Sequence, residues 1–158
     1  MSLKAAIQEW NERKQAELIQ SYEREGLKAS GRWARELEGQ TFERGNSYVT
    51  IIEGANYTEQ LVKGRGKSMK KGSGRSLREL IREWIDDKGI VPSGGISKES
   101  LSFLIARKIH RDGIIVPNKY NSGKFIDRVM NEKAISELKQ IVQRSFGEVV
   151  KSEIMKGL

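Results

Sequence analysis

The sequence predicts an α+β fold: a long N-terminal helix, a small antiparallel sheet, a helix pair and a C-terminal helix, all in a single domain spanning 1–158. Three observations support this prediction. Apolar residues recur at helical spacing near both ends of the chain. The β-branched and aromatic run 48–52 follows a Gly-Asn pair that suits a hairpin turn. Between these parts lie two amphipathic segments with helix-capping residues.

The first helix is predicted over residues 3 to about 28. Its apolar residues form two groups on different faces: Leu3, Ala6, Ile7 and Trp10, then Leu18, Ile19 and Tyr22. A stripe split in this way is typical of a long helix that packs against two different neighbours. Gly26 weakens the last turn, and Ser30-Gly31 indicates a break in the chain direction.

Two antiparallel strands are predicted between about Trp33 and Ile52, with Gly45-Asn46 as the turn. Phe42 on one side of the turn and the run 48–52 on the other supply the strand-forming residues. The following segment, 55–61, suits either a short helix or a third strand, and the sequence does not decide between them.

The helix pair has clear boundaries. Ser76 and Glu79 have the spacing of a capping box, and Lys88-Gly89 supplies the stop of the first helix. Ser97 can cap the second helix, which is predicted to run to Gly113. A short strand at 114–116 and a loop follow.

The final helix is predicted from about Asn131. Its apolar residues form a long, narrow stripe: Ile135, Leu138, Ile141 or Val142, Phe146, Val149 or Val150, and Ile154. A stripe of this shape suits packing against a partner subunit as well as against the chain's own core.

The glycine-rich loop 63–75, KGRGKSMKKGSGR, carries six cations and no acid, out of a net charge of +8 for the whole chain. Basic charge is therefore predicted to be concentrated in one loop rather than spread over a binding face. Two interpretations stay open: the loop contacts nucleic acid, or it is a solvated surface loop. The candidate contacts to nucleic acid, or to the lumen of an assembly, are Lys63, Arg65, Lys67, Lys70, Lys71 and Arg75.

The segment Gly66-Lys67-Ser68 matches the end of a phosphate-binding loop signature, but the rest of that signature is missing. The motif requires a second glycine five residues earlier, so that backbone amides can surround the phosphates. That position is Leu61. The sequence therefore argues against nucleotide binding.

The sequence predicts neither catalysis nor a bound metal or cofactor. It contains no cysteine, and His110, the one histidine, lies near a predicted helix end, where a cation is favoured by the helix dipole. Asp86 and Asp87 are adjacent, so on a helix they point in different directions. No run approaches the roughly 18 apolar residues of a membrane span, and the N-terminus lacks the apolar region of a signal peptide.

The order of these elements resembles that of the tail-completion or neck proteins of tailed bacteriophages, a family related to the minor tail-joining proteins of lambda-like phages. The resemblance covers about residues 5–150 and rests on an ordered set of short patterns. These are Ser30-Gly31-Arg32-Trp33, the hairpin, Tyr57 to Gly64 with its variable loop, Trp84 to Gly89, Ile109 to Gly113, Phe125-Ile126 and the final helix. Lys63 and Lys124 depart from the family pattern, which has an acid or aromatic residue and a proline there.

The resemblance implies a structural virion protein without catalysis. It implies a homo-oligomeric ring, a hexamer or dodecamer, at the head-to-tail junction or upper tail, assembled in the host cytoplasm. The genome would pass through it, and portal or head-closure and tail proteins would be its neighbours. The subunit-interface candidates are Trp10, Trp33, Tyr57 and Phe146, although the tryptophans suit a core equally well. The alternative is a small accessory protein that binds DNA without sequence specificity through the basic loop.

Overall fold

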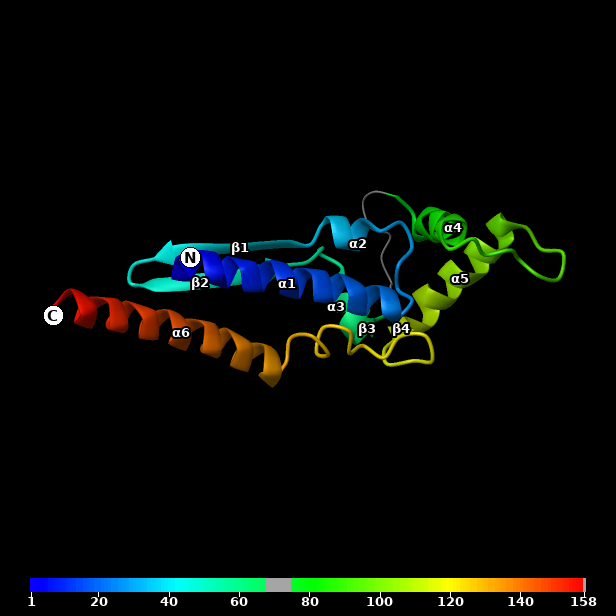
Figure 1. Ribbon diagram of the computed structural model, residues 1–158. Helices are drawn as coiled ribbons and strands as arrows, with labels where there is room; N and C mark the ends of the chain where they lie inside the picture. The colour runs from blue at the N-terminus through cyan, green and yellow to red at the C-terminus, as the bar shows by residue number, and fades with distance from the viewer. Residues whose placement is uncertain (68–74, 158) are drawn as a thin grey trace.

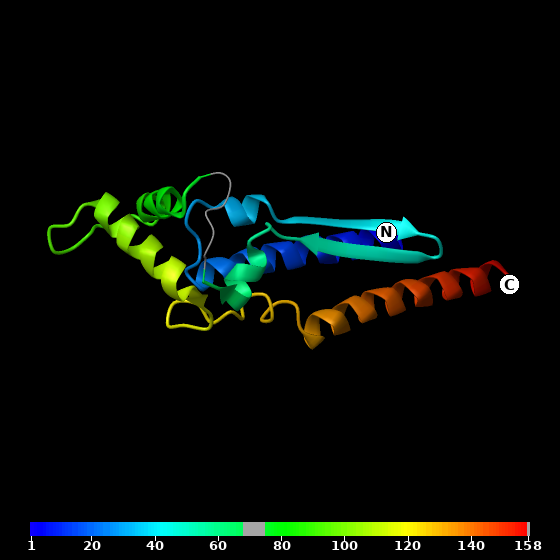
Figure 2. The ribbon, with the colours of Figure 1, turned by 180° about the vertical axis from the view of Figure 1, so that it is seen from behind.

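The computed structural model describes residues 1–67 and 75–157, and it confirms the predicted α+β class. Helix α1 and a β-hairpin lie side by side and form an elongated body, with a helix pair at one end and the C-terminal helix along the other (Figure 1; Figure 2). The elements are α1 (Leu3–Arg24), α2 (Arg32–Arg35), β1 (Glu38–Arg44), β2 (Ser47–Glu53), α3 (Thr58–Lys63), β3 (Gly64–Arg65), α4 (Leu77–Asp87), α5 (Lys98–Asp112), β4 (Ile114–Ile115) and α6 (Glu132–Lys156).

Helix α1 begins and ends where local chemistry dictates. The Ser2 hydroxyl accepts a hydrogen bond from the backbone N–H of Ala5, which satisfies one of the free donors of the first turn. The helix ends at Arg24, four residues earlier than predicted, because Gly26 takes the left-handed conformation with φ of +77°. As the split stripe predicted, α1 packs against two neighbours, the hairpin and α6.

The hairpin forms with the predicted turn. Arg44 pairs with Ser47 across the two-residue loop Gly45-Asn46, and the register continues to Glu38 opposite Glu53. Gly45 has φ of +60°, which two-residue hairpin turns require. Trp33, predicted near the start of the strand region, lies in the short helix α2. The segment 55–61, for which the sequence left helix and strand open, contains the start of helix α3.

Asn11 connects α1 to the hairpin. Its side chain is fully buried, and its amide nitrogen donates to the Thr50 hydroxyl at 2.7 Å and to the Ile51 carbonyl at 2.8 Å. Gly39 on β1 permits this close approach, because a Cβ there would lie 1.9 Å from the Asn11 side-chain oxygen and 2.1 Å from the Gln15 amide nitrogen. The buried amide and the glycine together bring the helix against the sheet.

We expect Gly39→Ala to lower the free energy of unfolding by about 1–3 kcal/mol, because the added methyl displaces Asn11 from its buried hydrogen bonds. Urea unfolding followed by circular dichroism measures the change. Gly147→Ala is the matched control: it lies within α6 with no atom within 4 Å of the added Cβ, and should stabilise by about 0.5–1 kcal/mol. Equal effects at the two positions would contradict the packing argument.

The core is centred on three aromatic rings contributed by distant parts of the chain. Tyr22 of α1 stacks on Trp33 of α2 with centroids 4.6 Å apart, and Phe125 meets both rings edge-on at 5.8 and 5.4 Å. The Trp33 indole N–H donates to the Thr58 hydroxyl at 2.9 Å, so its polar group is satisfied. Burial is the main cause that raises the pKa of Tyr22 to about 12.

Helix α6 is held to the body mainly through its first turns. Asn131 caps it, Ala134 is buried, and the Lys14 ammonium on α1 reaches Glu137 at 2.8 Å as well as Glu17 at 2.9 Å. Burial alone would lower the pKa of Lys14, but the hydrogen bonds and charges of these two carboxylates outweigh burial and raise it. The second half of α6 carries no buried residue.

Candidate nucleic-acid and subunit interfaces

The short ribbon of β3 and β4 joins two segments that lie about fifty residues apart in the sequence. Gly64 pairs with Ile115 and Arg65 with Ile114. Glycines make the contact possible: Gly64 and Gly113 both have positive φ, and a Cβ on either would lie 2.2 Å from a carbonyl oxygen of the facing segment. The ribbon thereby places the beginning of the basic loop beside the end of α5.

Asp112, at the end of α5, is within electrostatic range of cations from both segments. Arg111 holds its carboxylate with a hydrogen bond of 2.8 Å from Nε to Oδ1. This hydrogen bond is the main cause that lowers the pKa of Asp112, and the charges of Arg111, Lys108 and Lys67 add to it. One carboxylate among three cations leaves a strong excess of positive charge here.

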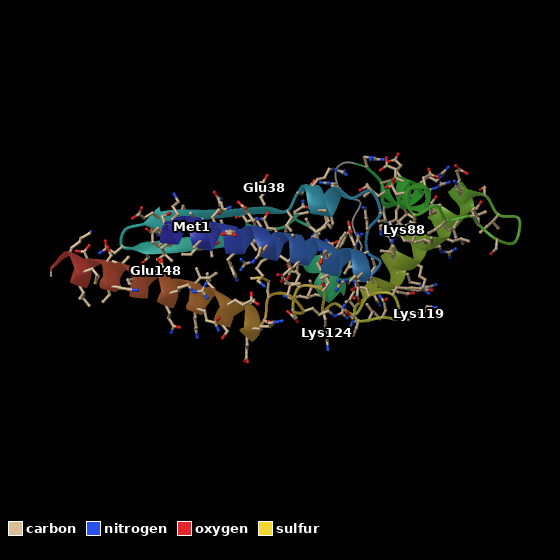
Figure 3. All side chains as sticks on the ribbon, viewed as in Figure 1. Met1, Glu38, Lys88, Lys119, Lys124 and Glu148 are labelled. Atoms are coloured by element: carbon tan, nitrogen blue, oxygen red, sulfur yellow. The ribbon has the colours of Figure 1, made fainter. Side chains whose placement is uncertain are left out.

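The loop after β4 extends this positive region. Its Asn121 side chain donates to the Leu61 carbonyl at 2.7 Å, which attaches the loop to the end of α3. Lys119 and Lys124 are exposed on this loop, along the edge of the molecule next to the ribbon (Figure 3). The exposed or half-buried cations of this region form what we call the basic surface: Arg65, Lys67, Lys108, Arg111, Lys119 and Lys124.

The basic surface adds a second stretch of positive charge to the loop in which the sequence predicts that the charge is concentrated. Residues 108–124 contain four cations and one carboxylate, a net charge of +3, and the pairing of β3 with β4 brings this stretch beside the start of the loop. The charge of this second stretch was visible in the sequence. What the sequence lacked was any signal that the two stretches meet.

The six predicted contacts of the basic loop separate into three groups. Arg65 and Lys67 belong to the basic surface. Lys63 pairs with Glu59 one turn earlier in α3 at 3.0 Å, and Arg75, which precedes α4, pairs with Glu83 of that helix. Lys70 and Lys71 lie outside the described residues.

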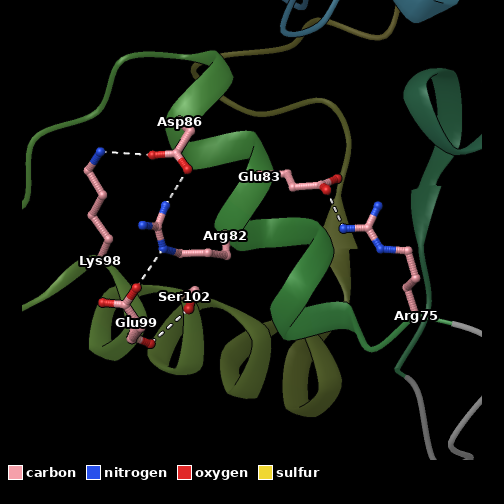
Figure 4. A network of polar contacts seen from close by, with 7 residues as sticks. All are labelled: Arg75, Arg82, Glu83, Asp86, Lys98, Glu99 and Ser102. Atoms are coloured by element: carbon pink, nitrogen blue, oxygen red, sulfur yellow. Dashed lines mark hydrogen bonds and ion pairs between the residues drawn. The ribbon is translucent and has the colours of Figure 1, made fainter.

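Helices α4 and α5 are joined along one side by an ionic network (Figure 4). Arg82 contacts Asp86 on its own helix and Glu99 on α5 at 2.9 Å, and Lys98 reaches Asp86 at 2.8 Å. The hydrogen bond from Arg82 is the first cause that lowers the pKa of Asp86 to about 2, and that from Lys98 the second. Asp86 is thus a structural ion-pair partner.

Both helices of the pair also carry exposed apolar side chains. On α4, Leu77, Leu80, Ile81 and Trp84 follow at i, i+3, i+4 and i+7. Leu80 is 47% exposed, Trp84 38%, and Leu104 of α5 50%.

The C-terminal helix carries a second exposed apolar surface. Six of its side chains are each at least 55% exposed: Ile135, Phe146, Val149, Val150, Ile154 and Met155. Phe146 and Val149 line a groove of about 650 Å³ whose other walls come from the beginning of α1 and from Tyr48 beside the hairpin turn. We call it the end groove.

The four predicted interface aromatics have different environments. Trp10 and Trp33 are 4% and 1% exposed inside this chain, so the structure favours the core alternative and we remove them from the interface set. Tyr57 is half-buried beneath the guanidinium of Arg32, 5.7 Å from its ring centroid. Phe146 is 59% exposed in the end groove and remains an interface candidate.

The residues considered for chemistry in the sequence do not come together in the described part of the chain. His110 is exposed in the last turn of α5, and within 1–67 and 75–157 no group of three or more potential metal-ligating side chains comes together. A cavity of about 360 Å³ between α1, the hairpin and α6 is lined by residues such as Trp10, Leu18 and Ile126, none of them ionisable. No helix of the described part of the chain is both long and apolar enough to span a bilayer.

Comparison with protein-family models, with curated proteins and with solved structures finds no match to this chain.

Proposed function

We propose that this chain is a structural protein of a tailed-phage virion that forms a homo-oligomeric ring at the head-to-tail junction, in the neck or upper tail. The observation that carries the proposal is the exposed apolar surface of α6, which the chain's own core leaves uncovered. An isolated protein seldom exposes so large an apolar surface unless it binds something. The ordered family-like patterns of the sequence support a neck or upper-tail ring as the assembly.

The proposed function is structural rather than catalytic and requires no cofactor. Portal or head-closure proteins and tail proteins would lie above and below the ring, and the basic surface would face the DNA that passes through it. A ring is the closed product of an interface between two different surfaces of the same protein.

Sedimentation velocity of the purified chain, together with images of assembled phage particles, tests this proposal. We expect a closed oligomer in solution and density for the chain between head and tail. A protein that stays monomeric at every concentration and is absent from particles would refute it.

A second candidate function, a DNA-binding accessory protein, is favoured by the basic surface. Phosphate contacts made by Lys and Arg release counterions, so binding would be sensitive to salt and blind to sequence. Because deletion of the loop from residue 64 would also remove β3, point substitutions are the better test.

We expect the double variant Lys108→Glu/Arg111→Glu to weaken binding to duplex DNA and to reduce the slope of log K against log salt by about 2. Lys139→Glu/Arg144→Glu on α6 changes the net charge equally and serves as the control. Titration at several salt concentrations gives both quantities. Equal losses in the two variants would show that net charge, not the basic surface, governs binding, and strong wild-type binding by monomers would favour the accessory protein over the ring.

A further inference from the structure

The cavity between α1, the hairpin and the first turns of α6 has the size and the lining of a small-molecule site. Its volume is about 360 Å³, within the roughly 300–1,000 Å³ typical of such sites. Its apolar wall includes Leu18, Leu37, Ile52, Ile126 and Leu138, and no ionisable side chain lines it. The cavity therefore suits an uncharged, largely apolar occupant, because a charge placed there would have no partner.

The polar side chains of the wall other than Trp10 already have hydrogen-bond partners within the chain. Asn11 uses both of its amide hydrogens, one of them on Thr50 at 2.7 Å, and its side-chain oxygen accepts from Gln15 at 2.7 Å. The Thr58 hydroxyl accepts from the Trp33 indole at 2.9 Å. None of these groups requires a ligand to satisfy it.

Trp10 is the exception in this wall. Its side chain is 4% exposed, and its indole N–H has no acceptor among the described residues. No other buried side-chain nitrogen or oxygen in the described part of the chain is left unpaired. A buried donor without a partner destabilises a fold, so each such group calls for an explanation. The cavity that Trp10 lines supplies one.

We propose that this cavity binds a neutral, mainly aliphatic small molecule that carries one hydrogen-bond acceptor, and that the acceptor meets the Trp10 indole N–H. The apolar wall contacts the hydrocarbon part, and the single unpaired donor favours an oxygen at one position. The indole nitrogen is covered, so a neighbouring side chain moves to admit the acceptor. Met130 in the wall is unbranched and suits this movement. The inference is independent of the proposed ring.

Two probes of nearly the same shape test the hydrogen bond: 2-heptanone, and 2-methyl-1-heptene, in which a methylene group replaces the carbonyl oxygen. Trp10→Phe keeps an aromatic ring and removes the N–H. The ketone should bind this variant about 2- to 10-fold more weakly than the wild type, whereas the alkene should bind it at least as tightly. Heptanoate, which is ionised at neutral pH, should bind the wild type at least about tenfold more weakly than the ketone.

Calorimetric thermal unfolding and NMR supply the readouts. A ketone concentration of about ten times the dissociation constant should raise the Tm by about 3–6 °C. The indole ¹H–¹⁵N resonance of Trp10, assigned by its absence from Trp10→Phe, should move downfield with the ketone and less with the alkene. Trp84→Phe is the matched control, since Trp84 is 38% exposed and does not line the cavity, and it should bind both probes like the wild type.

The outcomes decide between a ligand site and a structural gap. Equal losses of ketone and alkene affinity in Trp10→Phe would show that the ring and not its N–H matters, and would overturn the proposal. A wild-type chain that binds neither probe would also overturn it, and a long-lived water beside the indole in nuclear Overhauser spectra would then identify a water site. Leu138→Phe narrows the cavity and should weaken both probes, so unchanged affinities would place their binding elsewhere.

Discussion

Phe125→Ala is expected to lower the free energy of unfolding by about 3–5 kcal/mol. The ring is fully buried between Tyr22 and Trp33, and its own backbone carbonyl accepts a 2.7 Å hydrogen bond from the buried Ser21 hydroxyl. Truncation removes both edge-on contacts and leaves a cavity. A loss of this size is a large part of the roughly 5–15 kcal/mol that stabilises a typical domain.

Urea unfolding followed by tryptophan fluorescence measures the loss. Phe42→Ala is the control, since that ring is 38% exposed on β1 and should lose on the order of 1 kcal/mol. Phe125→Leu should lie between the two. If Phe125→Ala and Phe42→Ala cost the same, the aromatic cluster is not the centre of the core.

Glu25→Gln is expected to lower stability at neutral pH and to have a smaller effect at pH 3, where part of the contribution has been lost. Glu25 follows α1. Its carboxylate accepts hydrogen bonds from Ser122 and forms an ion pair with Arg128. The Ser122 hydrogen bonds are the leading cause that lowers the pKa of Glu25 to about 2, with Arg128 contributing less. Its side chain is 10% exposed, so these contacts are only weakly screened by solvent.

The direction of the pH dependence follows from this lowered pKa. The contribution is complete above the pKa of the unfolded chain, near 4.5, and is lost as pH falls toward 2. We expect a loss of about 2–3 kcal/mol in Glu25→Gln at pH 7. Unfolding free energies at pH 7 and pH 3 give the comparison, with the exposed Glu59→Gln as a control that should change little at either pH. A variant that is equally destabilised at both pH values would contradict the charge-based explanation.

The elements that the sequence predicted well are those with local signals. The capping box at Ser76 and Glu79 forms, with both reciprocal hydrogen bonds, and the hairpin turns at Gly45-Asn46. Each of these depends on residues within a few positions of one another, so propensity and spacing are sufficient to locate them.

The features that the sequence did not reveal depend on distant partners. Lys14 looks like a surface residue, yet it is buried because Glu137, more than a hundred residues later, reaches its ammonium. The basic surface likewise requires β3 to pair with β4, and two strands of two residues each leave almost no periodic pattern. Trp10 and Trp33 were ambiguous for the same reason, since an aromatic residue suits a core or an interface until its neighbours are known.

The β3–β4 ribbon divides the chain into a body and an insertion whose two ends meet. Because residues 64–65 pair with 114–115, the stretch between them begins and ends at the same place beside the body. The aromatic core includes no described residue of that stretch. The two ends of the stretch 66–113 meet at adjacent backbone positions. A shorter or longer insert could therefore replace this stretch while the body keeps its own core. Variation in the length of this stretch would change the surface that the protein offers to binding partners without changing how the body folds.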